Sequence, residues 1–448
     1  QAARAGHRVS VLERAARPGG MAASFEVAGV RVDHGSHRLH PTTDPAILAE
    51  LQRLLGGQLQ WRRRRGRIRL AGRWIGFPLR LGDLARHLPP SLVAAALADA
   101  VAAPLRRPRD DTFAEVVRAG PGPTALAVVY GPYASKLWGL DATALSGEQA
   151  RRRISVASPG AVVARLLGGG RARRRSPPGF WYPARGFGSI VEALAAAATE
   201  AGVELRHRLE VAAVALGGPG RGARVAMAGG GAVEAAHVWS TLPLTALAEV
   251  VVDPPPPPEV TAAARCLAFR ALVLVYLVLD LPRWTPYDAH YLPGPETPVS
   301  RVSEPKNYRD GPDDPPDRTV VCAELPCTVG DGVWAADDHE LGAVVVAGLA
   351  AQDLPPLRPV AVVSRRLPAA YPVYARGFED AFGALDAWAS SLPGLVTLGR
   401  GGLFAHDNTH HALAMGWAAA EALDPAGRWD PSSWAAARDR FAHHVVED

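Results

Sequence analysis

The order of apolar and polar positions along the chain predicts a mixed α/β protein. Short apolar runs between turn residues, typical of buried strands, occur at residues 7–12, 203–214, 238–242, 270–280 and 395–398. Alternation predicts a hairpin at 22–32 and β structure at 68–77. Longer segments predict helices at 45–55, 81–105, 186–201 and 410–423. With 448 residues, the chain is long enough for two domains with separate cores.

The first predicted strand ends in an acidic residue, Glu13, and follows the end of a helix at residues 1–6. In a Rossmann-type unit, the carboxylate that binds the ribose hydroxyls of a dinucleotide has this position. The glycine-rich loop G-x-G-x-x-G precedes such a strand, so we expect that the chain starts about one strand and one turn late. A strand ending in Glu is also common in other α/β proteins, and that alternative stays open on this feature alone.

A glycine pair and a histidine-rich segment follow Glu13. Gly19 and Gly20 allow backbone amides to approach a pyrophosphate closely, and residues 33–40 read D-H-G-S-H-R-L-H. This order resembles the FAD-binding half of the amine oxidase, protoporphyrinogen oxidase and phytoene desaturase superfamily. The histidine-rich segment is also similar to G-P-H-x-F-H of the UDP-galactopyranose mutases, which share the fold.

A second part of the same resemblance lies near the other end of the chain. Residues 398–402 (L-G-R-G-G) and 408–416 (N-T-H-H-A-L-A-M-G) predict a strand, then glycines, then the start of a helix. This order places backbone amide donors and the positive end of a helix beside an anion. Here the superfamily closes its second FAD contact, although His410 stands where the family pattern has an acid. The resemblance implies FAD as the cofactor, with contacts from Glu13, Arg14, Gly19, Gly20, Met21, Gly35, Ser36, His37, Arg38, Val211, Gly399, Arg400, Asn408 and Met415.

Two further motifs resemble the mutases. Residues 130–139 (Y-G-P-Y-A-S-K-L-W-G) and 300–308 (S-R-V-S-E-P-K-N-Y) are similar to Y-x-x-K-x-W-G and T-R-x-x-E-x-K-x-F. The resemblance implies that Lys136, Trp138, Arg301 and Lys306 bind substrate. The chain has no other lysine, and arginine does not replace a compact ammonium, so both lysines mark positions where the side chain matters. The alternative that they are buried scaffold partners of Glu304 stays open.

The resulting fold class is α/β, with a Rossmann-type FAD-binding domain that lacks its N-terminal glycine loop and a discontinuous mixed α+β substrate domain. The FAD-binding domain is expected at 1–75, 185–250 and 385–424, the substrate domain at 76–184 and 251–384, and a C-terminal helical tail at 425–448. The prolines at 254–258 predict a stiff crossing between the domains.

The resemblance implies an FAD-dependent oxidoreductase. A hydride would pass from a substrate carbon to flavin N5, with reoxidation by oxygen, a quinone or another acceptor. His37 is the candidate general base, with a structural histidine as the alternative. Two other functions stay open: isomerisation of a nucleotide sugar by reduced flavin, and a non-catalytic flavin-fold binding module.

Composition and charge narrow the partners. The net charge of +5, with 44 acidic residues interspersed, favours a small anionic substrate over nucleic acid, with a membrane surface as the weaker alternative. We interpret the arginine runs at 62–65 and 171–175 as solvated loops.

Cysteine usage and apolar run lengths bear on the compartment. Cys266, Cys322 and Cys327 lack C-x-x-C spacing, which predicts neither a disulfide framework nor a metal site and favours a cytoplasmic setting. No apolar run approaches the ~20 residues of a membrane span. The sequence does not indicate an oligomeric state.

Overall fold

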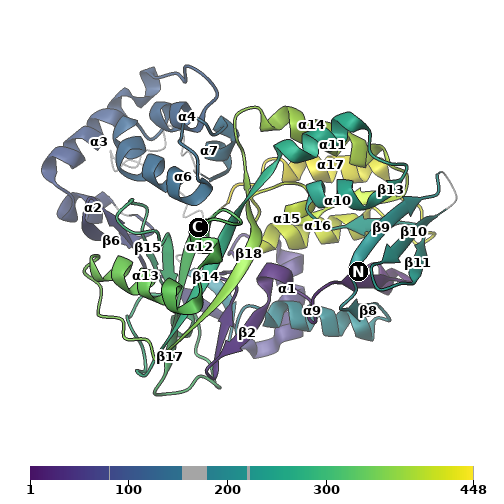
Figure 1. Ribbon diagram of the computed structural model, residues 1–448, viewed down its shortest axis with the longest axis horizontal. Helices are drawn as coiled ribbons and strands as arrows, with labels where there is room; N and C mark the ends of the chain where they lie inside the picture. The colour runs from purple at the N-terminus through teal and green to yellow at the C-terminus, as the bar shows by residue number, and fades with distance from the viewer. Residues whose placement is uncertain (80, 154–178, 219–221, 447–448) are drawn as a thin grey trace.

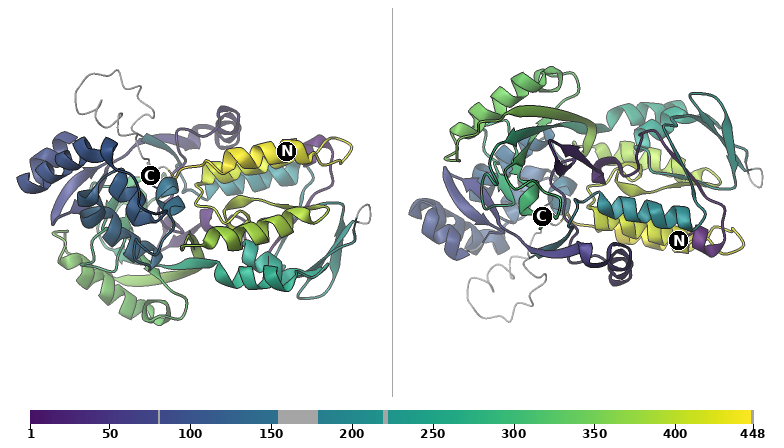
Figure 2. Two further views of the ribbon diagram at one scale, coloured as in Figure 1. Left: turned by 90° about the horizontal axis from the view of Figure 1, so that it is seen from above. Right: turned by 90° about the horizontal axis from the view of Figure 1, so that it is seen from below.

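The computed structural model describes residues 1–79, 81–153, 179–218 and 222–446. Two halves lie side by side (Figures 1 and 2). One half holds a large antiparallel sheet and a group of helices, and the other holds the shorter parallel strands. Within the described ranges, no helix combines the length and the apolar character needed to cross a bilayer.

The large sheet forms the centre of the first half. Its seven strands, in spatial order, are β18 (Ala361–Val373), β14 (Ala268–Leu279), β17 (Thr319–Cys327), β16 (Arg301–Ser303), β15 (Ala289–Tyr291), β5 (Gly66–Leu70) and β6 (Arg73–Phe77). Neighbouring strands are antiparallel, except that β15 and β5 are parallel. Residues 66–77 therefore pair with strands from the 251–384 region.

The apolar run expected at 270–280 forms β14, which is buried on both faces. Successive side chains point to opposite faces of a strand. Val273 and Val275 pack with α13 (Asp338–Ala350). Leu274 and Tyr276 pack on the hairpin of β2 (Ser24–Val27) and β3 (Val30–Asp33). A strand covered on both sides has no polar face, which explains its continuous apolar pattern.

Helices complete the first half. They are α2 (Leu81–His87), α3 (Pro90–Ala102), α4 (Phe113–Ala119), α5 (Pro123–Ala125), α6 (Gly131–Trp138), α7 (Gly147–Arg153) and α12 (Gly332–Ala335). The single helix expected at 81–105 is interrupted at Pro89 and Pro90, because proline lacks the N–H that a helix interior requires. Phe113, Leu137 and Trp138 form the core of this helical group.

The second half contains the expected Rossmann-type elements as two parallel strand pairs. β1 (Ser10–Glu13) pairs with β8 (Glu204–His207), and β12 (Val238–Ser240) pairs with β19 (Leu395–Thr397). A four-stranded sheet lies beside them: β11 (Ala232–Ala235), β10 (Ala223–Met227), β9 (Val211–Leu216) and β13 (Val251–Asp253). A further pair, β4 (Leu59–Arg63) and β7 (Gly179–Pro183), approaches the first half.

Eight helices pack on these strands within the described ranges. They are α1 (Pro45–Leu55), α9 (Ser189–Glu200), α10 (Leu244–Val250), α11 (Pro258–Cys266), α14 (Phe378–Ser391), α15 (Gly399–Gly402), α16 (Thr409–Glu421) and α17 (Pro431–Phe441). Short helical turns occur at Ala3–Ala5, Gly20–Ala22, Gly56–Gln58, Ala103–Leu105, Leu126–Tyr130 and Pro305–Asn307. The predicted helix at 45–55 is confirmed; it begins where the Asp44 side chain accepts hydrogen bonds from the amides of Ala46 and Ile47.

His290 makes stability depend on pH. Its side chain is 1% exposed in the large sheet, and burial lowers its pKa from 6.5 to about 3, with a smaller contribution from Arg67. The unfolded chain binds a proton below pH 6.5 that the folded chain does not bind, so stability is lost as the pH falls from 6.5 toward 3. At pH 5 this histidine is expected to cost about 2 kcal/mol relative to pH 7.5.

Urea unfolding at both pH values checks this expectation. His290→Leu should lose less free energy of unfolding between pH 7.5 and pH 5 than the unsubstituted protein does. His339→Leu, at an exposed histidine, should keep the original pH dependence. Equal pH dependence in all three proteins would contradict the role of His290.

Candidate active site

A cavity of about 280 Å³ is lined by residues from many parts of the chain, among them Val446 near its C-terminal end. This volume is near the lower end of the range for small-molecule sites. Its lining comes from many separate stretches of the chain: Gly19, Met21, Ala22, Ser36, His37, Arg38, His40, Arg64, Arg153, Gly179, Phe180, Arg301, Tyr371, Arg400, His406, Asp407, Asn408, Thr409, Ala412 and Val446. Eight of the residues expected in the site from the sequence are among them: Gly19, Met21, Ser36, His37, Arg38, Arg301, Arg400 and Asn408.

The glycine pair forms one rim of the cavity. Gly19 has a φ of 118°, and a Cβ there would lie 3.1 Å from both Ala23 Cβ and Val191 Cγ1. Only glycine adopts this conformation without strain. The close packing leaves the backbone of the Gly20–Ala22 turn as the surface offered to a ligand.

The buried side chain of Asp33 anchors the start of the histidine-rich segment. Its side chain is 4% exposed; Oδ1 accepts hydrogen bonds from Ser24 Oγ (2.5 Å) and Phe187 N (3.0 Å), and Oδ2 accepts one from the Tyr182 hydroxyl. The Asp33 carbonyl accepts a bond from the Tyr276 hydroxyl at 2.6 Å. The carboxylate thereby joins β2, β3, β7 and the turn before α9.

Past Asp33, the chain turns toward the cavity. Gly35 has a φ of 92°, and a Cβ there would approach Glu324 Oε1 to 3.2 Å. His37 stacks on Phe187 with ring centroids 5.2 Å apart, and its Nε2 lies 3.0 Å from the His34 carbonyl. Burial is the largest cause of the lowered pKa of His37, so this imidazole is neutral at neutral pH.

Arg301 is held by a buried carboxylate. Its Nε and Nη2 each donate to Glu324 at 2.9 Å in a bidentate pair, and the Glu324 side chain is 3% exposed. Glu324 also accepts from the Ser36 amide at 3.1 Å. This pair fixes the guanidinium at the cavity wall and ties it to the segment that carries His37.

Arginine dominates the charge of the cavity. The lining holds five guanidiniums, those of Arg38, Arg64, Arg153, Arg301 and Arg400, and one carboxylate, that of Asp407. Arg38 donates to Asp288 at 3.2 Å. Arg400 donates to the Ala370 carbonyl at 2.6 Å and lies over the Tyr371 ring. Burial lowers the pKa of Arg400, a sign that its charge is poorly solvated.

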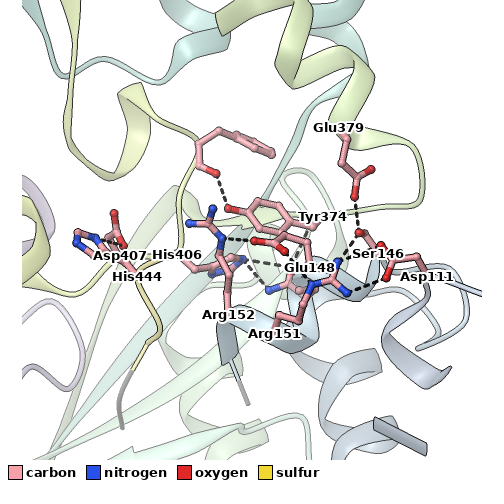
Figure 3. Close-up of polar contacts among 12 residues, drawn as sticks. Asp111, Ser146, Glu148, Arg151, Arg152, Tyr374, Glu379, His406, Asp407 and His444 are labelled. Atoms are coloured by element: carbon pink, nitrogen blue, oxygen red, sulfur yellow. Dashed lines mark hydrogen bonds and ion pairs between the residues drawn. The ribbon is translucent and has the colours of Figure 1, made fainter. Parts of the chain in front are cut away.

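Buried polar groups surround Asp407. His406 Nε2 lies 2.9 Å from the Gln149 amide nitrogen, and Arg152 donates to Glu148 at 2.7 Å (Figure 3). His410 stacks between His40 and His411, with ring centroids 5.4 and 4.0 Å away. Burial lowers the pKa of His410 to about 3, so a neutral imidazole stands where the family pattern has an acid.

Three of the expected cofactor residues lie together elsewhere, where β1 and β9 meet. Glu13 accepts from the Ala15 amide at 2.7 Å, Arg14 lies 3.6 Å from Glu210, and Val211 begins β9 directly after Glu210. Their assignment to the adenosine end of the cofactor stays a prediction. Gly20 and Gly35 stand beside lining residues, Gly399 begins the α15 turn, and Met415 is fully buried in the core.

The two lysines are bound to backbone carbonyls. Lys136 donates to Leu292 O (2.6 Å) and Val299 O (3.1 Å), and burial lowers its pKa to about 8. Lys306 donates to the carbonyls of Pro315 and Arg318. In the part of the chain that the structure describes, neither lysine pairs with Glu304 and neither lines the cavity. Their substrate-binding role stays a prediction, and these contacts favour a scaffold role.

Trp138 is 3% exposed in the helical core, where its ring meets that of His406 edge-on at 6.2 Å. Trp138 does not line the cavity itself; its ring contacts two lining residues, His406 and Arg153, whose guanidinium lies 5.7 Å from the ring centroid.

Several lining residues were missed from the sequence. The run at 62–65 is not a solvated loop as expected: Arg62 and Arg63 lie in β4, and Arg64 lines the cavity. The run at 171–175 lies outside the described residues. Arg153 ends α7. Asp407 directly precedes Asn408, so an acid one residue before the recognised motif was the signal that could have revealed it.

The lining suits a flavin dinucleotide. The Gly19 to Ala22 turn and the first turn of α16, whose N-cap is Asn408, bring backbone amides to the cavity, and such amides bind phosphates. Arg38 Nε and Arg400 Nε are buried without a hydrogen-bond partner in the described structure. A polar ligand in the cavity would satisfy such donors.

Parallel strand pairs, a glycine rim and a polar cavity between two halves define a flavoenzyme with separate nucleotide and substrate regions. The chain belongs to the flavin-containing amine oxidoreductases, whose family model matches residues 3–423. The family is flavin-containing, which confirms the FAD cofactor expected from the sequence. Because its members are flavoenzymes, the alternative of a non-catalytic binding module is wrong. No curated protein sequence matches the chain significantly.

Solved structures support the same fold. Reduced UDP-galactopyranose mutase superposes with a TM-score of 0.78 at 17% identity, covering 97% of this chain and 94% of that one. A protein from Exiguobacterium sp. assigned as a protoporphyrinogen oxidase gives a TM-score of 0.66 at 18% identity, covering 89% and 91%. Putrescine oxidase bound to putrescine gives 0.60 at 18% identity, covering 98% and 95%. These identities relate the folds and leave the substrate open.

Proposed function

We propose that this chain is an FAD-dependent oxidoreductase that removes a hydride from a small anionic substrate. The observation that carries the proposal is the lining of the cavity, with five guanidiniums against one carboxylate. A cleft lined by one sign of charge attracts ligands of the opposite sign. Asp288 and Glu324 offset part of this charge behind Arg38 and Arg301. The remaining positive excess of the lining favours a carboxylated or phosphorylated compound over a protonated amine.

Arg301 is the residue we assign to the substrate anion. Its guanidinium is held by Glu324 through two bonds of 2.9 Å, so little side-chain entropy remains to be lost when a ligand binds. A planar guanidinium is well suited to carboxylate and phosphate oxygens.

His37 is the residue we assign to proton transfer. Bound FAD supplies the hydride acceptor, at flavin N5. Because a carbonyl only accepts hydrogen bonds, the contact of His37 Nε2 with the His34 carbonyl places the imidazole proton on Nε2 and leaves Nδ1 as the acceptor. The lowered pKa of His37, caused mainly by burial, keeps this base neutral and ready to take a proton from substrate.

A binding and reduction assay tests the proposal. The FAD-loaded protein is titrated with three probes: UDP-galactopyranose, protoporphyrinogen and putrescine. We expect the anionic probes to perturb the visible flavin spectrum, with affinity that falls as salt is raised, and putrescine to have no effect at matched ionic strength. Flavin reduction by putrescine, without reduction or binding by either anion, would overturn the anionic assignment.

Isomerisation of a nucleotide sugar stays a second candidate, because five arginines suit a diphosphate as well as a carboxylate. The two reactions differ in their need for reductant. An oxidase substrate bleaches the oxidised flavin in one turnover under anaerobic conditions. A mutase converts UDP-galactopyranose only after dithionite has reduced the flavin, with no net oxidation of the sugar.

A further inference from the structure

Three metal-binding side chains converge beside the cavity at a point that the proposed reaction does not use. Asp407 lies two residues before the start of α16, His411 lies in the first turn of α16, and His444 comes from the segment that follows α17. One ligand atom from each residue lies within 4.8 Å of the other two. Figure 3 shows the Asp407 carboxylate facing the His444 ring.

The spacing of these atoms fits a tetrahedral ion. Asp407 Oδ1 lies 3.3 Å from His411 Nδ1 and 3.3 Å from His444 Nδ1. Both distances exceed the usual range for a nitrogen-to-oxygen hydrogen bond. Zinc binds nitrogen and oxygen ligands at about 2.0–2.1 Å, and the edge of a tetrahedron with that radius is about 3.3 Å. These two separations therefore match the spacing of ligands around one zinc ion, and the ligand nitrogens of the two histidines lie within 4.8 Å of each other.

The electrostatics of the cluster call for a cation between the ligands. The Asp407 side chain is 0% exposed, and neither of its oxygens has a hydrogen-bond partner among the described residues. A buried carboxylate without a hydrogen bond is costly. His411 Nδ1 accepts from the Asn408 amide at 3.2 Å, so it carries no proton, and its single lone pair would turn from that amide to a metal ion.

The arginines near Asp407 are engaged by other groups. Arg152 is bound by Glu148 at 2.7 Å, and Arg400 donates to the Ala370 carbonyl at 2.6 Å. His444 Nδ1 is buried without a hydrogen-bond partner in the described chain, which leaves a second nitrogen ligand directed at Asp407.

We propose that Asp407, His411 and His444 form a binding site for a divalent transition-metal ion, with zinc as the best fit to two imidazoles and one carboxylate at tetrahedral spacing. Asp407 also lines the cavity, so the fourth position of the ion faces water or a cavity ligand. The ion would replace the long contact of the Asn408 amide with His411.

The bound metal ion would tether the C-terminal segment to the start of α16. Its three ligands join the start of α16 to the residues beyond α17. Val446 lines the cavity, and its amide donates to the Arg152 carbonyl at 2.8 Å. Metal binding would therefore fix the part of the cavity wall that the C-terminal segment provides.

Zinc binding to the FAD-loaded protein, stripped of metal with a chelator, tests the proposal. A competition titration with a chromophoric chelator should show one Zn²⁺ per chain. His444→Ala and Asp407→Asn should each weaken binding by roughly 100-fold or more, since even an outer-shell partner can be worth that much. His443→Ala, at the exposed neighbouring position, should bind zinc as the unsubstituted protein does.

A second readout guards against misfolding. Zinc should slow carboxypeptidase digestion of the C-terminal segment in the unsubstituted protein and in His443→Ala, but not in His444→Ala. Equal zinc affinity in the unsubstituted protein and His444→Ala would overturn the proposal. The absence of stoichiometric zinc binding would also overturn it, and would indicate that a proton, not a metal ion, neutralises the Asp407 carboxylate. Neither readout needs a substrate, so the outcome is independent of the proposed function.

Discussion

Replacement of Asp33 by alanine is expected to lower the free energy of unfolding by about 3 kcal/mol or more. Asp33 accepts hydrogen bonds from Ser24 Oγ, Phe187 N and the Tyr182 hydroxyl in a site that is 4% exposed. Each buried donor left without an acceptor costs about 1–3 kcal/mol. The donors come from three parts of the chain, so no single local movement can satisfy them all.

Urea unfolding of Asp33→Ala and Asp33→Asn measures this loss. The asparagine variant keeps one acceptor oxygen and should fall between alanine and the unsubstituted protein. Asp313→Ala removes an exposed carboxylate that pairs with Arg185 at 3.1 Å and should change stability by less than about 0.5 kcal/mol. If Asp33→Ala and Asp313→Ala unfold at the same urea concentration, the role given to Asp33 is wrong.

Asp33 also illustrates what the sequence could indicate. The D-x-G-x-H order pointed to a segment near the flavin, and Ser36, His37 and Arg38 do line the cavity. The sequence did not reveal that the aspartate works as an acceptor beneath that segment. Its partners at 24, 182 and 187 belong to β2, β7 and the turn before α9, and hydrogen bonds between such distant segments have no local signature.

The strands show the same division between local and distant information. The apolar run at 270–280 predicted a buried strand, and β14 occupies Ala268–Leu279. Its neighbours β17 and β18 lie far along the chain, and its register with them depends on which side chains meet α13 and which meet the β2–β3 hairpin. Alternation within one strand cannot show which residues will cover each face.

The arginines and lysines of the site were hard to predict for a related reason. Arg64 and Arg153 belong to runs of like charge, which usually form solvated surface, and only the fold turns them toward the cavity. Lys136 and Lys306 were singled out because lysine is rare in this chain. Each ammonium donates to two carbonyls, a compact geometry that a guanidinium does not reproduce. The rarity of lysine therefore pointed to positions that need an ammonium, but it did not show that backbone carbonyls are the partners.

Arg301→Ala is expected to weaken the binding of an anionic ligand by roughly 30-fold or more, the equivalent of about 2 kcal/mol for a lost hydrogen bond to a charged group. The same change leaves Glu324, whose side chain is 3% exposed, without its guanidinium partner. Breaking a buried ion pair by removing one member costs about 3–5 kcal/mol, so this variant is expected to lose stability together with ligand affinity, and alone it cannot separate the two roles.

The double variant Arg301→Ala/Glu324→Gln separates them. Glutamine keeps an acceptor for the Ser36 amide while removing the buried charge, so we expect the melting temperature to recover most of the loss seen in Arg301→Ala. If Arg301 binds the substrate, affinity for UDP-galactopyranose or protoporphyrinogen, whichever binds the unsubstituted protein more tightly, stays low in the double variant. Recovery of both melting temperature and affinity would show that Arg301 serves only as the counterion of Glu324. Glu324→Gln alone completes the cycle: it keeps the guanidinium at the cavity wall, so it should retain ligand affinity if the cation itself is what the anion requires.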